Sequence, residues 1–215
     1  MQITTPMTTP MSSTPMRSDR RGFLGLLACA GVAAVLPFRP AHALDAGSAR
    51  ALIDRSLGEV YQVINSGQAP ATMYQQFEAI FARYADVDVI ARSALGPAAR
   101  QTDGATFAAY KQAFQGYIGR KYGKRFHEFV GSRIEVTGAR QLKSFYAVTS
   151  VAYLNGRAPM EVEWHVSDRS GQDLYFNIII EGVNMLASER AEVAAMLSRR
   201  RGDVAALTAD LRQAG

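Results

Sequence analysis

Hydrophobic residues in the first half of the chain recur every three or four positions, the spacing of an amphipathic helix. Two such stripes are separated by the turn-forming segment 65–67, and Pro70 suits the first turn of the second helix. The stripes consist of Ile53, Leu57, Val60, Tyr61 and Ile64, then Phe77, Ile80, Phe81 and Tyr84. The pattern also predicts a short helix over about 87–95 and a long, aromatic one from Asp103 to about Val130.

After Gly131 the hydrophobic period shortens from 3.6 towards 2, which predicts β-strands. The expected strands cover about 132–141, 144–154, 160–168 and 173–181. Asn155-Gly156 lies between the second and third strands and is a strong hairpin signal. Apolar residues alternate with polar ones along the third strand, so we expect an antiparallel meander with one covered face.

Two further helices are expected at the end of the chain, over about 187–200 and 203–213. Helices, then strands, then helices is the order of an α+β fold, not of an alternating α/β fold. Residues 44–215 contain no linker-like segment and no internal repeat, which indicates one domain.

Residues 1–43 have the layout of an export signal. The pair Arg20-Arg21 precedes an apolar stretch from Phe23 to Phe38, and Ala41-His42-Ala43 fits an A-x-A cleavage site. Paired arginines before Phe-Leu are similar to the twin-arginine signal, which exports folded proteins. We therefore expect cleavage after Ala43 and a periplasmic mature domain, residues 44–215.

Three alternatives concern this N-terminal segment. Asp19 stands where a twin-arginine signal usually has Ser or Thr, so the general secretory route stays open. A retained anchor is disfavoured because the sixteen apolar-stretch residues fall short of the roughly 20 that span a bilayer. Leu26-Leu27-Ala28-Cys29 loosely resembles a lipoprotein cleavage site, although the apolar run continues after it.

Charge and cysteine content exclude several classes of protein. The chain carries 24 basic and 19 acidic residues, but four of the basic residues and one acidic residue precede residue 44. The remainder is close to +2, which is too little for a nucleic-acid-binding footprint. Cys29 is the one cysteine, so an internal disulfide or a multi-cysteine metal site is ruled out.

Candidate catalytic groups are few. The chain has no G-x-S-x-G, Walker or G-x-G-x-x-G motif. His127-Glu128 lacks the second histidine of an H-E-x-x-H zinc site, because Gly131 occupies that position. His165 shares the polar face of its strand with Glu161 and Glu163, which fits either a zinc or acid–base site or an ordinary solvated face.

Several short motifs resemble the MlaC family, the periplasmic phospholipid carriers of the toluene-tolerance or Mla pathway. The segment 177–185, Asn-Ile-Ile-Ile-Glu-Gly-Val-Asn-Met, is similar to the last strand of that family, with Glu-Gly-Val as its most specific part. The segment 90–96 is similar to the family's Ala-Arg-x-x-Leu-Gly. The aromatic helix and the Val162-Glu163-Trp164 strand follow in matching order, so the resemblance covers about residues 50–212.

The resemblance implies an NTF2-like or MlaC-like fold, in which helices pack over a four-stranded antiparallel sheet and leave an apolar cavity for acyl tails. It also implies a monomeric carrier without a cofactor or catalytic role. Such a carrier exchanges phospholipid with an inner-membrane ABC transporter complex that contains an MCE-type protein, and with an outer-membrane lipoprotein complex, and so maintains outer-membrane lipid asymmetry. A carrier of another lipid, such as a hopanoid, and an NTF2-like enzyme using His165 remain alternatives.

Candidate site residues follow from this resemblance and from the apolar faces, although every one of them also fits core packing or a solvated helix face. The expected lipid-tail contacts are Phe81, Ile90, Phe114, Tyr117, Ile118, Tyr122, Val148, Val162, Trp164, Phe176, Ile178 and Ile180. The expected docking residues, for an acidic partner or anionic head groups, are Arg120, Lys121, Lys124 and Arg125.

Overall fold

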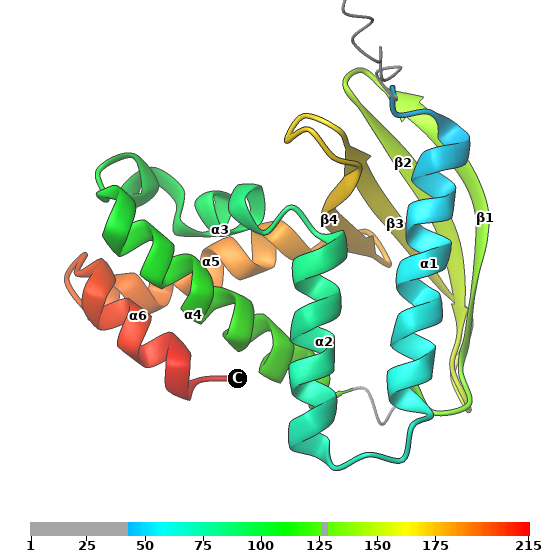
Figure 1. Ribbon diagram of the computed structural model, residues 1–215, viewed down its shortest axis with the longest axis horizontal. Helices are drawn as coiled ribbons and strands as arrows, with labels where there is room; N and C mark the ends of the chain where they lie inside the picture. Colours follow the sequence, from blue (N-terminus) through cyan, green and yellow to red (C-terminus); the bar gives the residue numbers. More distant parts are fainter. Residues whose placement is uncertain (1–42, 126–128) are drawn as a thin grey trace, which may run out of the picture. The chain divides into compact units, whose positions relative to one another are not determined.

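The computed structural model describes residues 43–125 and 129–215, which form helices and one antiparallel sheet (Figure 1). The helices are α1 (Ala46–Ile64), α2 (Pro70–Tyr84), α3 (Val87–Leu95), the 3-10 helix η1 (Gly96–Arg100), α4 (Gly104–Gly123), α5 (Met185–Arg199) and α6 (Val204–Gln213). The strands are β1 (Arg133–Leu142), β2 (Phe145–Tyr153), β3 (Met160–Ser167), β4 (Leu174–Ile180) and β5 (Val183–Asn184). The predicted α+β fold is confirmed.

Short polar side chains start most of the helices. Asp45 and Ser48 form a reciprocal capping box at α1, and Asp103 accepts two backbone N–H bonds at the start of α4. These contacts satisfy donors that the first turn of a helix leaves unpaired. Pro70 occupies the first turn of α2, as the sequence predicts.

The long aromatic helix is shorter than expected. The prediction extended it to about Val130, but α4 ends at Gly123 and the chain continues as a turn through Lys124 and Arg125. Glycine is a weak helix former, which favours an end of the helix at this point. The longer helix was predicted from the spacing of apolar residues, and that spacing does not take the low helix propensity of glycine into account. His127-Glu128 and the predicted signal features within residues 1–42, including Cys29, lie outside the described residues.

The sheet is a meander of order β1-β2-β3-β4-β5, with every neighbouring pair antiparallel. The sequence predicted four strands, and the fifth is a two-residue strand that pairs with the end of β4. Glu181 and Gly182 form the tight turn between them, both at positive φ. Two residues are too few to produce a periodic pattern, so this strand escapes sequence-based detection.

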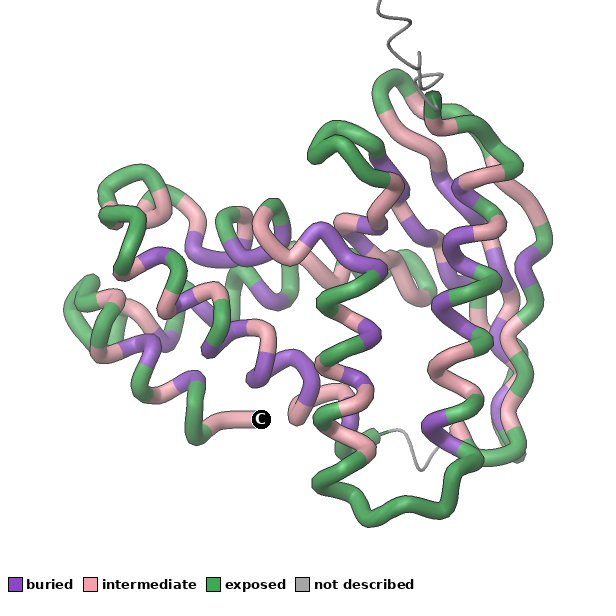
Figure 2. Tube along the Cα trace, viewed as in Figure 1, coloured by how far each residue is buried: buried purple, intermediate pink, exposed green. Residues whose placement is uncertain are grey.

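Helix α1 covers one face of the sheet and contacts β1, β2 and β3, with α2 packed beside it (Figure 1). The pairing of Val148 with Trp164, and of Trp164 with Ile178, places these side chains on one face of the sheet. Helix α4 packs against α2, α3 and α6, while α5 contacts α3 and the end of the sheet at β4. Buried positions follow the inner sides of these elements (Figure 2). None of the helices in the described part of the chain is long and apolar enough to span a bilayer.

Candidate functional site

A cavity of about 490 Å³ lies between the covered face of the sheet and helices α1 to α5. This volume is within the range of about 300–1,000 Å³ that ligand sites in proteins commonly have. Its wall is mainly apolar, formed largely by Leu57, Val60, Ile64, Phe77, Ile80, Phe81, Ile90, Ile118, Met160, Val162, Trp164, Tyr175, Ile178, Ile180 and Leu186. The chain therefore encloses apolar space that its own side chains do not fill.

Strand alternation builds one wall of this cavity. Val162 pairs with Ile180 and Trp164 pairs with Ile178, so four apolar side chains of β3 and β4 share the covered face. The indole N–H of Trp164 donates to Ser150 Oγ at 3.0 Å, and the ring meets Tyr175 edge to face at 5.5 Å. The hydrogen bond satisfies the polar atom of a buried indole and fixes the ring at the cavity wall.

Nine of the twelve predicted lipid-tail contacts line the cavity. They are Phe81, Ile90, Ile118, Tyr122, Val162, Trp164, Phe176, Ile178 and Ile180. Contact with lipid stays a prediction for all of them.

The other three predicted contacts, Phe114, Tyr117 and Val148, are buried but are not among the cavity-lining residues. Helix α4 packs against α2, α3 and α6, and the rings of Phe114 and Tyr117 lie next to each other along it, tilted, with centroids 6.2 Å apart. Val148 lies on the covered face of β2, four residues from the lining residue Ala152, and is fully buried. An apolar stripe cannot show which of its members face open space.

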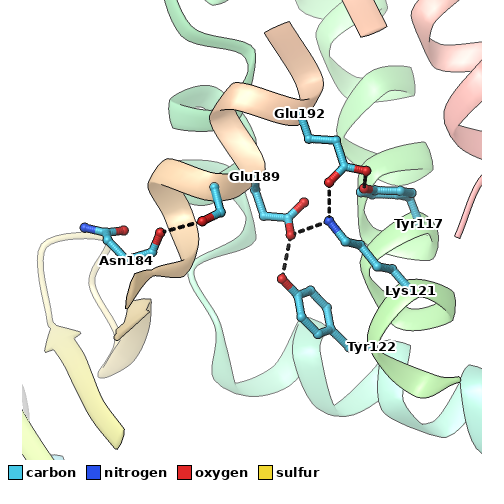
Figure 3. A network of polar contacts seen from close by, with 7 residues as sticks. Tyr117, Lys121, Tyr122, Asn184, Glu189 and Glu192 are labelled. Atoms are coloured by element: carbon cyan, nitrogen blue, oxygen red, sulfur yellow. Dashed lines mark hydrogen bonds and ion pairs between the residues drawn. The ribbon is translucent and has the colours of Figure 1, made fainter. Parts of the chain in front are cut away.

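A charged side chain also lines the cavity. Glu189 of α5 is 4% exposed, and its Oε1 accepts hydrogen bonds from Lys121 Nζ at 2.8 Å and from the Tyr122 hydroxyl at 2.5 Å. Lys121 Nζ also contacts Glu192 at 2.5 Å, and the Tyr117 hydroxyl donates to the same carboxylate at 2.6 Å (Figure 3). We refer to these five residues as the Lys121 cluster.

Hydrogen bonds within the Lys121 cluster stabilise the charged forms of Lys121 and Glu192. Burial lowers the pKa of Lys121, but hydrogen bonds with Glu189 and Glu192 outweigh burial, and the pKa lies above its ordinary value. Hydrogen bonds from Lys121 and Tyr117 hold the pKa of Glu192 below its ordinary value. The cluster thus joins α4 to α5 beside the cavity through charge-assisted bonds.

Sequence reasoning missed Glu189 and Glu192 as partners of Lys121. The glutamates lie 68 and 71 residues further along the chain, and periodicity says nothing about contacts at that separation. The one available signal was the pair of glutamates three residues apart, which share a face of a helix.

The opening of the cavity is marked by its exposed lining residues, Arg125, Arg157 and Val183. The first comes from the turn after α4, the second from the β2–β3 turn and the third from β5. Two guanidinium groups therefore lie at the rim of a mainly apolar site.

The four predicted docking residues have different surroundings. Arg120 donates to the carbonyls of Leu211 and Ala214 at the end of α6, at 2.6 and 2.9 Å, and Lys124 Nζ donates to the carbonyl of Gly215. Lys121 belongs to its cluster, and Arg125 lies at the cavity rim. The structure thus gives Arg120, Lys121 and Lys124 intramolecular partners, and their docking role stays a prediction.

The candidate catalytic trio lies elsewhere. Glu161, Glu163 and His165 occupy β3 positions that alternate with Val162 and Trp164, so they lie on the sheet face opposite the cavity. His165 Nε2 is 2.9 Å from Glu163, which also accepts from Arg140 at 2.9 Å. Burial raises the pKa of Glu163, but these hydrogen bonds outweigh it and leave the pKa below its ordinary value. Among the described residues, no group of three or more His, Cys, Asp or Glu side chains is placed to hold a metal ion.

Comparison with known proteins gives a family and a fold. Among solved structures, the chain is similar to a phospholipid-binding protein from Ralstonia solanacearum, solved in complex with a phospholipid. The two share 18% sequence identity with a TM-score of 0.66, over 77% of this chain and 95% of that one. No curated protein matches the chain. The family model for the MlaC protein matches residues 54–213, so the resemblance seen in the sequence is confirmed, and the chain belongs to the MlaC family.

Proposed function

We propose that the protein is a periplasmic phospholipid carrier that holds the acyl tails of its cargo in the cavity between sheet and helices. The observation that carries this proposal is the mainly apolar, unfilled cavity of about 490 Å³. Family membership and the phospholipid in the similar Ralstonia structure support it.

The energetics of lipid transfer fit such a site. A two-tailed phospholipid carries roughly 30 methylenes, and exposing them costs about 0.8 kcal/mol each, on the order of 24 kcal/mol in total. Free diffusion through water is therefore negligible, and a carrier must offer apolar surface comparable to that of the bilayer. Side chains such as Trp164, Ile178 and Phe77 provide it.

The head group stays at the rim in this proposal. Burying an unpaired phosphate is costly, and Arg125 and Arg157 offer positive charge at the opening. Loading and release then need no bond to be made or broken. By analogy with the MlaC family, we propose two exchange partners for this carrier. They are an inner-membrane ABC transporter complex with an MCE-type protein and an outer-membrane lipoprotein complex.

Transfer of fluorescent phospholipid between donor and acceptor liposomes tests the proposal. Ile178 lines the cavity, whereas the adjacent Ile179 pairs with Glu163 on the other face of the sheet. Ile178→Trp fills cavity space and is expected to reduce the transfer rate at least tenfold, while Ile179→Trp adds the same ring outside the cavity and keeps the wild-type rate. Wild-type protein that transfers no lipid, or equal rates for the two variants, would contradict the proposal.

A further inference from the structure

Large apolar side chains are exposed beside the opening of the cavity. Within residues 43–125 and 129–215, three such side chains are exposed, Val89 at 39%, Val130 at 51% and Val183 at 54%. Val183 lines the opening, and Val130 directly follows the lining residue Phe129. The two most exposed valines therefore lie where the apolar cavity meets solvent.

The turns that carry these valines meet at one end of the sheet. The side chain of Asn155, in the β2–β3 turn, donates to the carbonyl of Val130 at 3.2 Å. The backbone N–H of Glu181, in the β4–β5 turn, donates to the carbonyl of Glu161 near the start of β3 at 3.0 Å. Because β3 starts where the β2–β3 turn ends, both turns lie at the same end of the sheet, together with Arg157.

Basic side chains predominate around this opening. Arg125 and Arg157 are exposed and line it, and Lys124 precedes Arg125 in the turn after α4. Of the acidic residues nearby, Glu181 accepts a hydrogen bond at its carboxylate from the backbone N–H of Glu161. Glu161 itself lies on the sheet face opposite the cavity. Positive charge next to exposed apolar side chains is the chemistry that an anionic membrane surface attracts.

We propose that Arg125, Val130, Arg157 and Val183, here called the opening face, dock on the surface of an anionic phospholipid bilayer. The valines enter the boundary between head groups and acyl chains, and the guanidinium groups contact lipid phosphates. Docking places the cavity opening against the acyl chains. This inference rests on the proposed carrier function, because it gives an acyl tail a route from bilayer to cavity that does not cross water.

Such docking is reversible, as a carrier requires. Each arginine near an anionic surface strengthens binding by about fivefold, and salt weakens this attraction. A single myristoyl chain gives only marginal, reversible membrane binding, and two valine side chains contain fewer apolar carbons than one such chain. The opening face is therefore suited to brief contact and not to permanent anchoring.

Cosedimentation of protein purified from the periplasm with lipid vesicles tests the docking surface. The wild-type protein is expected to bind vesicles of equal parts phosphatidylglycerol and phosphatidylcholine, and to bind phosphatidylcholine vesicles about fivefold more weakly or less. Val130→Asp places a carboxylate against the anionic surface and is expected to weaken binding to the mixed vesicles by about fivefold or more.

Val89→Asp is the matched control. It adds the same charge at another exposed valine, in the first turn of α3, where a carboxylate suits the helix dipole. Helix α3 contributes no residue to the opening face, so this variant is expected to bind the mixed vesicles as the wild type does. Equal binding by Val130→Asp and Val89→Asp would overturn the assignment of the opening face.

Native mass spectrometry separates this inference from the carrier function. Val130 is not among the cavity-lining residues, so Val130→Asp is expected to keep its bound phospholipid while it loses vesicle binding. Wild-type protein that holds phospholipid but does not sediment with the mixed vesicles would overturn bilayer docking. That result would leave the carrier function intact and indicate a protein partner for the opening face.

Discussion

A carboxylate at an apolar cavity is stable only if its charge is compensated. Glu189 is almost fully buried, and Lys121 with the Tyr122 hydroxyl supplies that compensation at its Oε1. Removing one member of a buried ion pair commonly costs 3–5 kcal/mol, because the other charge is left without a partner. The Lys121 cluster therefore makes the wall of the cavity sensitive to single substitutions.

Lys121→Met tests this dependence. The variant leaves Glu189 without its cation and is expected to lower the free energy of unfolding by about 3 kcal/mol, measured by urea denaturation. Lys111→Met is the matched control on the same helix, since Lys111 pairs with Asp88 at an exposed site and its loss should cost less than about 1 kcal/mol. Equal, small losses for the two variants would show that the cluster does not stabilise the fold.

Buried tyrosines determine the response to alkaline pH. Burial raises the pKa of Tyr110, Tyr117, Tyr122 and Tyr175 well above the ordinary value near 10. The unfolded chain loses these phenolic protons near pH 10 while the folded chain keeps them, so stability is full below that pH and falls as the pH rises above it.

An absorbance titration at alkaline pH, with circular dichroism recorded in parallel, measures this directly. At least four of the nine tyrosines are expected to ionise only as the circular dichroism signal is lost. Ionisation of all nine in protein that keeps its native signal would contradict the assignment.

At the level of helices and strands, most of the architecture was predictable. The 3.6 and 2 periods and the Asn155-Gly156 hairpin signal located α1 to α3, α5, α6 and four strands within a few residues, except that α1 begins at Ala46, before its apolar stripe. The end of α4 and the short β5 were missed. Both depend on a few residues at a turn, where local backbone preferences outweigh hydrophobic spacing.

Close contact between α2 and α4 depends on a glycine that lines the cavity. A methyl group at Gly119 would lie 3.0 Å from Glu78 Cβ and 3.3 Å from its Cα, whereas one at Gly58, exposed within α1, would meet nothing within 4 Å. Gly119→Ala is therefore expected to destabilise the fold by about 1–3 kcal/mol, and Gly58→Ala to stabilise it by about 0.5–1 kcal/mol. Thermal unfolding of the two variants measures the difference. Stabilisation by both substitutions would show that the helices are free to separate.

For the whole molecule, the cavity results from the way in which the helices pack against the sheet. The sequence predicts this packing only in part. Apolar stripes identified the covered faces, and nine of the proposed contacts reach the cavity wall. The stripes could not distinguish Ile178, which borders open space, from Phe114, which fills the interior of the helical layer. That difference depends on the angles at which α4 and the sheet meet their neighbours, which residue spacing does not encode.

Native mass spectrometry of the wild-type protein, followed by organic extraction, tests most directly whether the cavity carries phospholipid. The wild-type chain is expected to hold one bound phospholipid, and that mass is expected to be lost in Ile178→Trp but not in Ile179→Trp. A ligand-free mass that stays unchanged after incubation with phospholipid liposomes would contradict it.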